Sequence, residues 1–260
     1  MVRRIFLGAA LLLFVALVPA TFRGASPTAD EIMDKVRENR YPDTSQAMIT
    51  MTLAEPKGKP FIKKFTMWRK VQGTTAKTLI VFHFPPEIKG TSFLVLQDGD
   101  KEDTFAKFTE NPMIQHIGES QRTDRFMGSD FTYGDLRIDR KGEDNYQLMG
   151  EETIDGKPCY IIQSTPKDLK KAQYVKVMLW VDKEKFVPLK SEFYEKKKGE
   201  KVKTLDVKKV EFIEKTWTAT VSIMTDLKDR HQTRMELSEI KFRIPLKDDM
   251  FTQRTLLRGL

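Results

Sequence analysis

The sequence predicts a mainly β protein of the α+β class, built on one curved antiparallel sheet of about ten strands. From residue 45 onward, apolar and polar residues alternate with a period of two over most of the chain, which is typical of strands with one buried face. Turn-forming pairs such as Asp155-Gly156 separate the alternating segments. Helical periodicity is limited to the two ends and one central segment. Because a large twisted sheet curls, we expect short helices to fill its open side over an apolar concavity.

Residues 1–20 are expected to be a signal peptide. Arg3 and Arg4 precede an apolar run that is too short for a comfortable membrane span, and Val18-Pro19-Ala20 offers small residues for a signal peptidase. Cleavage is expected near Ala20. No cysteine stands directly after the apolar run, so the chain is expected to lack the acylation site of a lipoprotein. The remaining residues, 21–260, contain no linker rich in Pro, Ser or Gly and are expected to form a single exported domain in the periplasm.

The composition sets limits on the partners and on the source of stability. The formal net charge is +8, and the basic residues are spread along the chain. Without a stripe of basic residues interleaved with aromatics, nucleic acid is not expected as a partner, whereas weak attraction to anionic membranes is. Cys159 is the single cysteine, so no intrachain disulfide forms and stability must come from the core.

A short amphipathic helix is expected after the signal peptide. Thr28 and Glu31 have the spacing of a capping box. The apolar residues Ala29, Ile32, Met33 and Val36 then fall on one helical face, and the helix is expected to end near Tyr41-Pro42. Its apolar face is expected to lie on the sheet.

Alternation predicts the strands. Four are expected in a meander at 45–53, 61–67, 78–84 and 93–96, and seven follow the central segment, at 146–153, 159–164, 174–181, 187–194, 203–212, 217–224 and 234–244. The stretch 98–120 is less regular, and Asn111-Pro112 interrupts it. Residues 174–181 are apolar on both faces, which favours a place at the centre of the sheet.

The central segment, residues 126–136, reads FMGSDFTYGDL. Its glycines and aromatic residues fit neither one strand nor one long helix, so it is expected to be an irregular helical insert that covers part of the sheet. Asp130 and Asp135 could form a carboxylate pair, but helix capping is the favoured role for Asp130. At the C-terminus, Asp248 is expected to cap a last short helix that Gly259 ends.

The chain offers little for catalysis. Its three histidines are far apart and lack metal-ligand spacing with Cys, Asp or Glu. It also lacks a G-x-S-x-G elbow and a glycine-rich phosphate loop. No metal, no cofactor and no enzymatic activity are therefore expected. The 12 methionines and 17 phenylalanines are an apolar surplus, and methionine adapts to varied apolar ligands, which is consistent with a soft acyl-binding cavity.

The chain as a whole resembles the LolA-like family of periplasmic outer-membrane lipoprotein-sorting proteins. The resemblance rests on the signal peptide, the helix that begins Ala29-Asp-Glu-Ile-Met33, the strand series, the segment Phe126-Met-Gly-Ser-Asp-Phe-Thr-Tyr133 with Asp135-Leu136, and Ile244-Pro-Leu-Lys-Asp-Asp-Met-Phe251. It implies an incomplete β-barrel closed by helices, with a hydrophobic cavity that shields acyl chains of lipoproteins or lipids on their way to the outer membrane. It also implies an inner-membrane transporter and an outer-membrane acceptor as partners, and a monomer.

The cavity and lid residues follow from the alternation and the central segment. Candidates for the cavity lining are Phe65, Met67, Ile80, Phe82, Phe84, Phe93, Met178 and Trp180. Candidates for the lid are Met127, Phe131 and Tyr133. A competing hypothesis is a periplasmic adaptor that carries nothing and docks on an inner-membrane lipid exporter or an outer-membrane assembly. It predicts a filled core and an exposed apolar patch. An enzyme acting on lipid would need a convergent polar cluster in the pocket.

Overall fold

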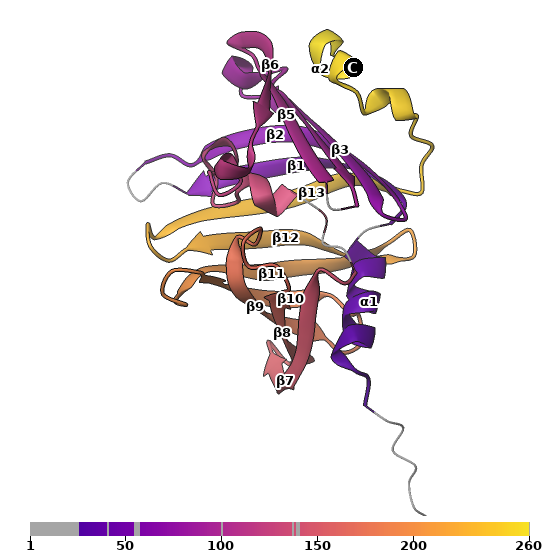
Figure 1. Cartoon of the computed structure of the whole chain (residues 1–260), viewed down its shortest axis with the longest axis vertical. Coiled ribbons are helices and arrows are strands. Elements are labelled where there is room, and N and C mark those ends of the chain that lie inside the picture. Colours follow the sequence, from indigo (N-terminus) through magenta and orange to yellow (C-terminus); the bar gives the residue numbers. More distant parts are fainter. Residues whose placement is uncertain are drawn as a thin grey trace, which may run out of the picture.

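The computed structural model describes residues 26–40, 42–54, 58–99, 101–136, 138 and 141–259. The expected signal peptide, residues 1–20, lies outside them. The described residues form one curved, unclosed antiparallel sheet with thirteen strands and a few short helices (Figure 1). No described helix is long and apolar enough to cross a membrane.

The first half of the chain contributes one helix and six strands. They are α1 Ala29–Arg40, β1 Thr44–Ala54, β2 Phe61–Gln72, β3 Thr75–Phe84, β4 Ser92–Asp98, β5 Lys101–Phe108 and β6 Asn111–Ile117. The second half contributes β7 Asp144–Ile154, β8 Lys157–Pro166, β9 Tyr174–Asp182, β10 Pro188–Glu195, β11 Lys201–Ile213, β12 Thr216–Asp226, β13 His231–Phe242 and α2 Gln253–Arg258. Short 3₁₀ helices are η1 Pro86–Ile88, η2 Glu119–Gln121, η3 Phe126–Gly128, η4 Tyr133–Leu136 and η5 Asp248–Met250.

The strand order explains why the central segment exists. The order is β6-β5-β4-β3-β2-β1-β13-β12-β11-β10-β9-β8-β7. Strand β1 lies near the middle of the sheet, and the next strands extend it to the edge at β6. The chain then begins again at the opposite edge with β7 and extends back to the middle at β13. Residues 118–143, which we call the crossing segment, must therefore pass from one edge of the sheet to the other. Residues 126–136 lie in this segment and cross in front of the strands in Figure 1.

Two expectations about the strands were wrong. The stretch 98–120, expected to be less regular, forms the hairpin β5–β6, whose two strands added to the eleven expected segments give thirteen. Pro112 is tolerated in β6 because this is an edge strand, where a missing amide donor breaks no ladder bond. Strand β9 is apolar on both faces but stands third from the β7 edge, whereas β13 is central. Helix α1 on one face and packed side chains on the other account for its composition.

The predicted capping box and hairpin turn are confirmed, whereas the expected helix cap at Asp248 is wrong. The amide of Glu31 donates to Oγ1 of Thr28 at 3.2 Å and the amide of Thr28 donates to Oε2 of Glu31 at 2.8 Å, which is the predicted capping box. Asp155 and Gly156 have φ of 48° and 78°, as a two-residue hairpin turn requires. Asp248 lies in η5, but the residue that caps α2 is Thr252.

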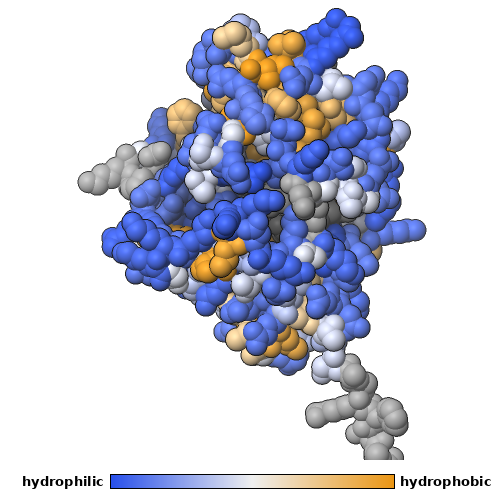
Figure 2. All heavy atoms as spheres, in the orientation of Figure 1, coloured by the Kyte–Doolittle hydropathy of each residue, from blue (hydrophilic) through white to orange (hydrophobic). Residues whose placement is uncertain are grey.

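Direct strand pairing defines one continuous inner face. Leu53 faces Thr233, and the row continues through Met224, Leu205, Ser191, Leu179 and Ile162. The apolar side of α1 packs on this row at Ile162, as its periodicity predicted. The crossing segment covers the same face over β1–β5. Seen from this side, the surface is mostly hydrophilic, with apolar side chains in separate small areas (Figure 2).

Candidate functional site: the inner face and the crossing segment

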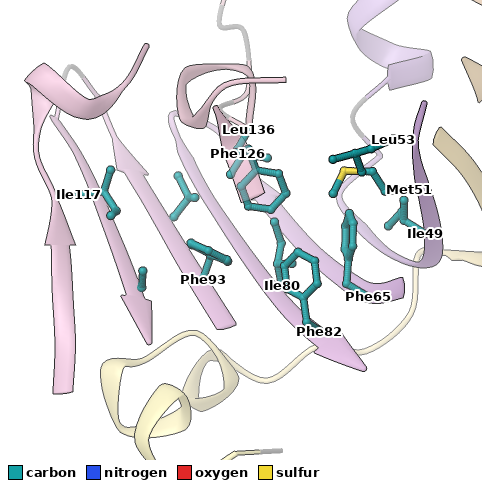
Figure 3. Close-up of a cluster of buried hydrophobic side chains, with 12 residues drawn as sticks. Ile49, Met51, Leu53, Phe65, Ile80, Phe82, Phe93, Ile117, Phe126 and Leu136 are labelled. Atoms are coloured by element: carbon teal, nitrogen blue, oxygen red, sulfur yellow. The ribbon is translucent and has the colours of Figure 1, made fainter. Parts of the chain in front are cut away.

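Five of the eight predicted cavity residues lie together on the inner face. Phe65, Ile80, Phe82 and Phe93 belong to one buried cluster, and Met67 packs against it. Their strands are β2, β3 and β4, and the cluster extends to β1, β5 and β6 (Figure 3). The spacing of two within each strand and direct pairing between strands bring these side chains to the same face.

The structure does not bring the other three to this cluster. Phe84 is 44% exposed and follows a register shift between β2 and β3 that turns its side chain from the row of Phe82. Met178 and Trp180 flank Leu179 in β9 and therefore lie on the outer face. There, Nε1 of Trp180 donates to Oε2 of Glu152 at 2.5 Å. The side chains of Trp180 and Met178 belong to a separate cluster that also contains Cys159.

Phe126 lies at the centre of the cluster, although no sequence signal distinguished it from Phe131. Its ring centroid lies 5.1 Å from that of Phe93, 5.9 Å from that of Phe82 and 6.2 Å from that of Phe65. Figure 3 shows the ring above the strands, pointing into the cluster beside Leu136. The ring of Phe126 is fully buried. Phe126, from the crossing segment, thus fills the space between the side chains that the alternation predicted to line a cavity.

The three predicted lid residues have different environments. Met127 and Tyr133 are half-buried and pack against the inner cluster. The Tyr133 ring lies 5.8 Å from those of Phe93 and Phe126. Phe131 does not join the cluster, and its carbonyl oxygen accepts from the Phe126 amide at 2.8 Å, which closes the loop. Met127 has a φ of 51°, a left-handed conformation that costs a residue with a β-carbon on the order of 1 kcal/mol.

Two pockets of the described chain lie away from the inner cluster. One, of about 120 Å³, lies on the outer face between β3 and α2, with Leu79, Val81 and Leu256 in its wall and Lys107 and Arg258 at its side. Another, of about 350 Å³, is open and lies at the end of β3, β4 and β5, near Thr75 and Asp98. The inner cluster is packed in this state, with Phe126 in its middle.

A polar network at Asp130 anchors the crossing segment to β13. The Asp130 side chain is fully buried, and its Oδ2 accepts from Nδ1 of His231 at 2.7 Å and from Oγ1 of Thr233 at 2.6 Å. The other oxygen, Oδ1, lies 3.6 Å from Nη1 of Arg125 and makes no hydrogen bond. The amide of Asp130 donates to Oγ1 of Thr233 at 2.9 Å. The expected capping role of Asp130 is therefore wrong, whereas Asp135, within η4, accepts from the amide of Thr132 at 2.8 Å.

Lysines from two distant strands hold the main chain of the same segment. Lys203 in β11 donates to the carbonyl oxygen of Asp130 at 2.7 Å, and Lys63 in β2 donates to that of Met127. Burial lowers the pKa of Lys63 below its ordinary value. The crossing segment thus sits between cationic groups from both halves of the sheet.

Further contacts join the segment to the loops at one end of the sheet. Arg125 lies 3.1 Å from Oδ2 of Asp226 and 2.5 Å from Oδ2 of Asp229. Oγ1 of Thr132 donates to Oε1 of Gln173 at 3.0 Å. Beneath it, burial and then the carboxylates of Asp135 and Asp226 raise the pKa of Tyr174 well above its ordinary value.

The site combines a buried apolar cluster on the inner face with polar contacts that attach the crossing segment above it. In the described part of the chain, no group of three or more His, Cys, Asp or Glu side chains could hold a metal ion. His231 is the histidine that the structure brings to the site. No sequence signal pointed to it, because 101 residues separate it from Asp130.

Comparisons with known proteins concern the fold of the whole chain. A family model described only as "Uncharacterized protein" matches residues 74–258. No curated protein matches the chain. A DUF1329 family protein from Desulfovibrio piger is 27% identical with a TM-score of 0.82, and the alignment covers 88% of this chain and 97% of that one.

Two further solved structures carry the name of the fold. A putative outer membrane lipoprotein-sorting protein domain from Vibrio parahaemolyticus is 25% identical, with a TM-score of 0.81 over 88% of this chain and 98% of that one. A LolA superfamily protein from Nitrosomonas europaea is 25% identical, with a TM-score of 0.72 over 88% and 99%. The chain therefore belongs to the family whose model it matches over residues 74–258, and its fold is LolA-like.

Proposed function

We propose that this protein is a periplasmic carrier that binds acyl chains of lipoproteins or lipids on its inner face and moves them towards the outer membrane. The observation that carries the proposal is the place of Phe126. A fully buried aromatic side chain, supplied by a non-strand segment, occupies the middle of an apolar face on an unclosed sheet. Such a residue can leave without unfolding the strands below it.

In this proposal an acyl chain replaces Phe126. The lining would be Phe65, Met67, Ile80, Phe82 and Phe93, and the lid would be Met127, Phe126 and Tyr133. Each acyl methylene that leaves water contributes about 0.8 kcal/mol, so several methylenes can offset the lost burial of one phenylalanine. The fold needs no reactive group for this exchange.

The polar anchors set how easily the lid leaves. Lys63, Lys203 and Thr233 hold the lid by hydrogen bonds to its main chain, and His231 holds it through the carboxylate of Asp130. These bonds do not depend on which apolar side chain lies below. The lid can therefore return to the same position after release of cargo. An inner-membrane transporter and an outer-membrane acceptor are the proposed donor and recipient.

Native mass spectrometry with lipid extraction tests the carrier. Protein purified from the periplasm without detergent is expected to hold a lipid or an acylated peptide at near one-to-one ratio. The variant Phe126→Ala is expected to bind a fluorescent fatty acid more tightly than the unaltered protein, because the competing ring is gone. Phe212→Ala, which removes a ring that is 59% exposed, is the matched control. If Phe126→Ala, shown to be folded by circular dichroism, binds no phospholipid, lipopeptide or fatty acid, the carrier proposal fails.

One observation favours a second candidate, an adaptor that carries nothing. The inner cluster is packed, and an adaptor is expected to have a filled core. It would use an exposed surface in place of a cavity. If native mass spectrometry shows only the mass of the protein alone, and the protein also fails to bind added lipid and lipopeptide, the adaptor is favoured.

A further inference from the structure

Three connections between strands form one continuous end of the sheet. They are residues 167–173 between β8 and β9, 195–201 at the turn from β10 to β11, and 226–230 at the turn from β12 to β13. Because these strands are antiparallel neighbours, the three connections emerge at the same end of the strands. Nζ of Lys196 donates to the carbonyl oxygen of Leu169 at 3.2 Å, and Nζ of Lys228 lies 2.5 Å from Oε2 of Glu195. We call these residues the basic rim.

The charge of the basic rim is strongly one-sided. It has nine basic and five acidic residues. Glu195 pairs with Lys228 within the rim, Asp226 and Asp229 pair with Arg125, and Lys201 pairs with Glu192 outside the rim, so seven basic residues face two acidic residues, Asp168 and Glu200, outside these pairs. Exposed lysines stand at the tips of all three connections, namely Lys167, Lys170, Lys171, Lys196, Lys197, Lys198 and Lys228. The rim therefore presents a positive surface.

Apolar side chains project from the same tips. Leu169 is 48% exposed and Leu227 is 40% exposed, and each has a lysine within one residue. Two separate turns that each combine an exposed leucine with exposed lysines match a lipid bilayer surface, where the leucines enter the headgroup boundary and the lysines meet anionic headgroups.

We propose that the basic rim docks on an anionic lipid bilayer surface. Eight of its nine basic residues are lysines. Lysine is a compact point charge on a flexible stem, whereas specific recognition of carboxylates on a protein favours the planar fork of arginine. A diffuse anionic surface thus fits the rim better than an acidic protein does.

The position of the rim relates docking to the crossing segment. Arg125 of that segment binds Asp226 and Asp229 in the rim, and Thr132 binds Gln173 at the base of another connection. A bilayer that meets the rim therefore lies next to the attachment points of the crossing segment. The proposal adds a surface to the carrier but does not rest on it, because vesicle binding is measured without transfer of lipid.

Sedimentation with vesicles tests the rim. The full mature chain is expected to bind vesicles that contain phosphatidylglycerol and not vesicles of phosphatidylcholine alone. The triple variant Lys196→Glu, Lys197→Glu, Lys198→Glu is expected to lose at least about tenfold in vesicle affinity, because each lysine near an anionic surface contributes on the order of a fivefold gain. Salt at about 1 M, where the Debye length is roughly 3 Å, is expected to release the unaltered protein. Leu169→Ser with Leu227→Ser is expected to weaken binding several-fold.

The matched control reverses three exposed lysines away from the rim, with Lys208→Glu, Lys215→Glu and Lys241→Glu. It has the same net charge as the rim triple and is expected to bind nearly as well as the unaltered protein. Equal losses in both triples would mean that net charge alone drives binding, and this would overturn the rim. Absence of binding to phosphatidylglycerol vesicles would also overturn the proposal and leave an acidic protein surface as the alternative partner.

Discussion

Nδ1 of His231 lies 2.7 Å from Oδ2 of Asp130, although the two residues are 101 positions apart. This contact joins the crossing segment to the central strand β13. The carboxylate is fully buried, and its Oδ1 has no hydrogen-bond partner while Arg125 stands 3.6 Å away. A buried carboxylate is costly unless it is paired. We infer that Asp130 fixes where the crossing segment sits, and that its pairing decides how firmly.

The variant Asp130→Asn is expected to loosen the crossing segment. The amide keeps the shape but loses the charge, so its bonds to His231 and Thr233 weaken and Arg125 loses one carboxylate. We expect a loss of about 1–3 kcal/mol in the free energy of unfolding, and faster hydrogen exchange at residues 126–136 than elsewhere. Urea unfolding and exchange mass spectrometry measure the two effects.

The control for this variant is Asp229→Asn. Asp229 also pairs with Arg125, but its side chain is 67% exposed. A single exposed ion pair is worth little, and we expect a change within about 0.5 kcal/mol. If both variants change stability and exchange by the same amount, the buried network around Asp130 is not the anchor.

The variant Phe126→Ala tests how much the central ring stabilises the packed state. Deletion of a fully buried phenylalanine ring typically costs about 3–5 kcal/mol. We expect the low end of this range, because the crossing segment can collapse into the space more easily than a strand can. Thermal and urea unfolding measure the loss, with Phe212→Ala expected to cost less than about 1 kcal/mol. A loss below 1 kcal/mol for Phe126→Ala would show that the ring is not a packing centre.

The local elements could be predicted because the signals that specify them are local. The capping box at Thr28 and Glu31 and the turn at Asp155-Gly156 involve residues within a few positions of one another. The face that each strand presents is different. Strand β9 is apolar on both faces, so alternation cannot tell whether Leu179 or Trp180 faces inward. That choice depends on register across the sheet, including the shifts between β9 and β10.

The candidate site was predictable in place but not in detail. A glycine-broken aromatic segment pointed to a cover over the sheet, and Met127 and Tyr133 do pack on the inner cluster. Phe126 and Phe131 look alike in the sequence, yet one is buried at the centre and the other is not in the cluster. The contact of Asp130 with His231 follows from the passage of the chain between opposite edges, which no local pattern encodes.

The carboxyl group of Glu192 is expected to make the free energy of unfolding depend on pH. Burial raises the pKa of this carboxyl, but hydrogen bonds from Lys190, Lys201 and Tyr194 outweigh it and lower the pKa from 4.5 to about 2. A lowered folded-state pKa means that the ionised group stabilises the fold above pH 4.5, and that this contribution is lost as the pH falls from 4.5 towards 2.

We therefore expect Glu192→Gln to be less stable than the unaltered protein at pH 7, by about 1–3 kcal/mol, and the difference to shrink as the pH falls through this window. Urea unfolding at pH 7, 4.5 and 3 checks it. A difference that stays constant from pH 7 to pH 3 would show that the ionised form of Glu192 has no special partners in the fold.

Cys159 offers a direct probe of whether β8 opens without global unfolding. The thiol is fully buried, and burial followed by the nearby Asp182 carboxylate raises its pKa above the ordinary value. The thiolate is the reactive form, so access and ionisation both oppose reaction in the folded protein. A thiol reagent at pH 8 is expected to label the native protein at least about 10³-fold more slowly than the unfolded protein, with a rate that follows the population of the unfolded state as urea rises. Because the chain has one cysteine, the signal comes from this site alone. Fast labelling in native buffer would mean that β8 separates from β7 or β9 while the rest of the sheet stays folded, and the edge near β7 would then be the mobile side of the sheet.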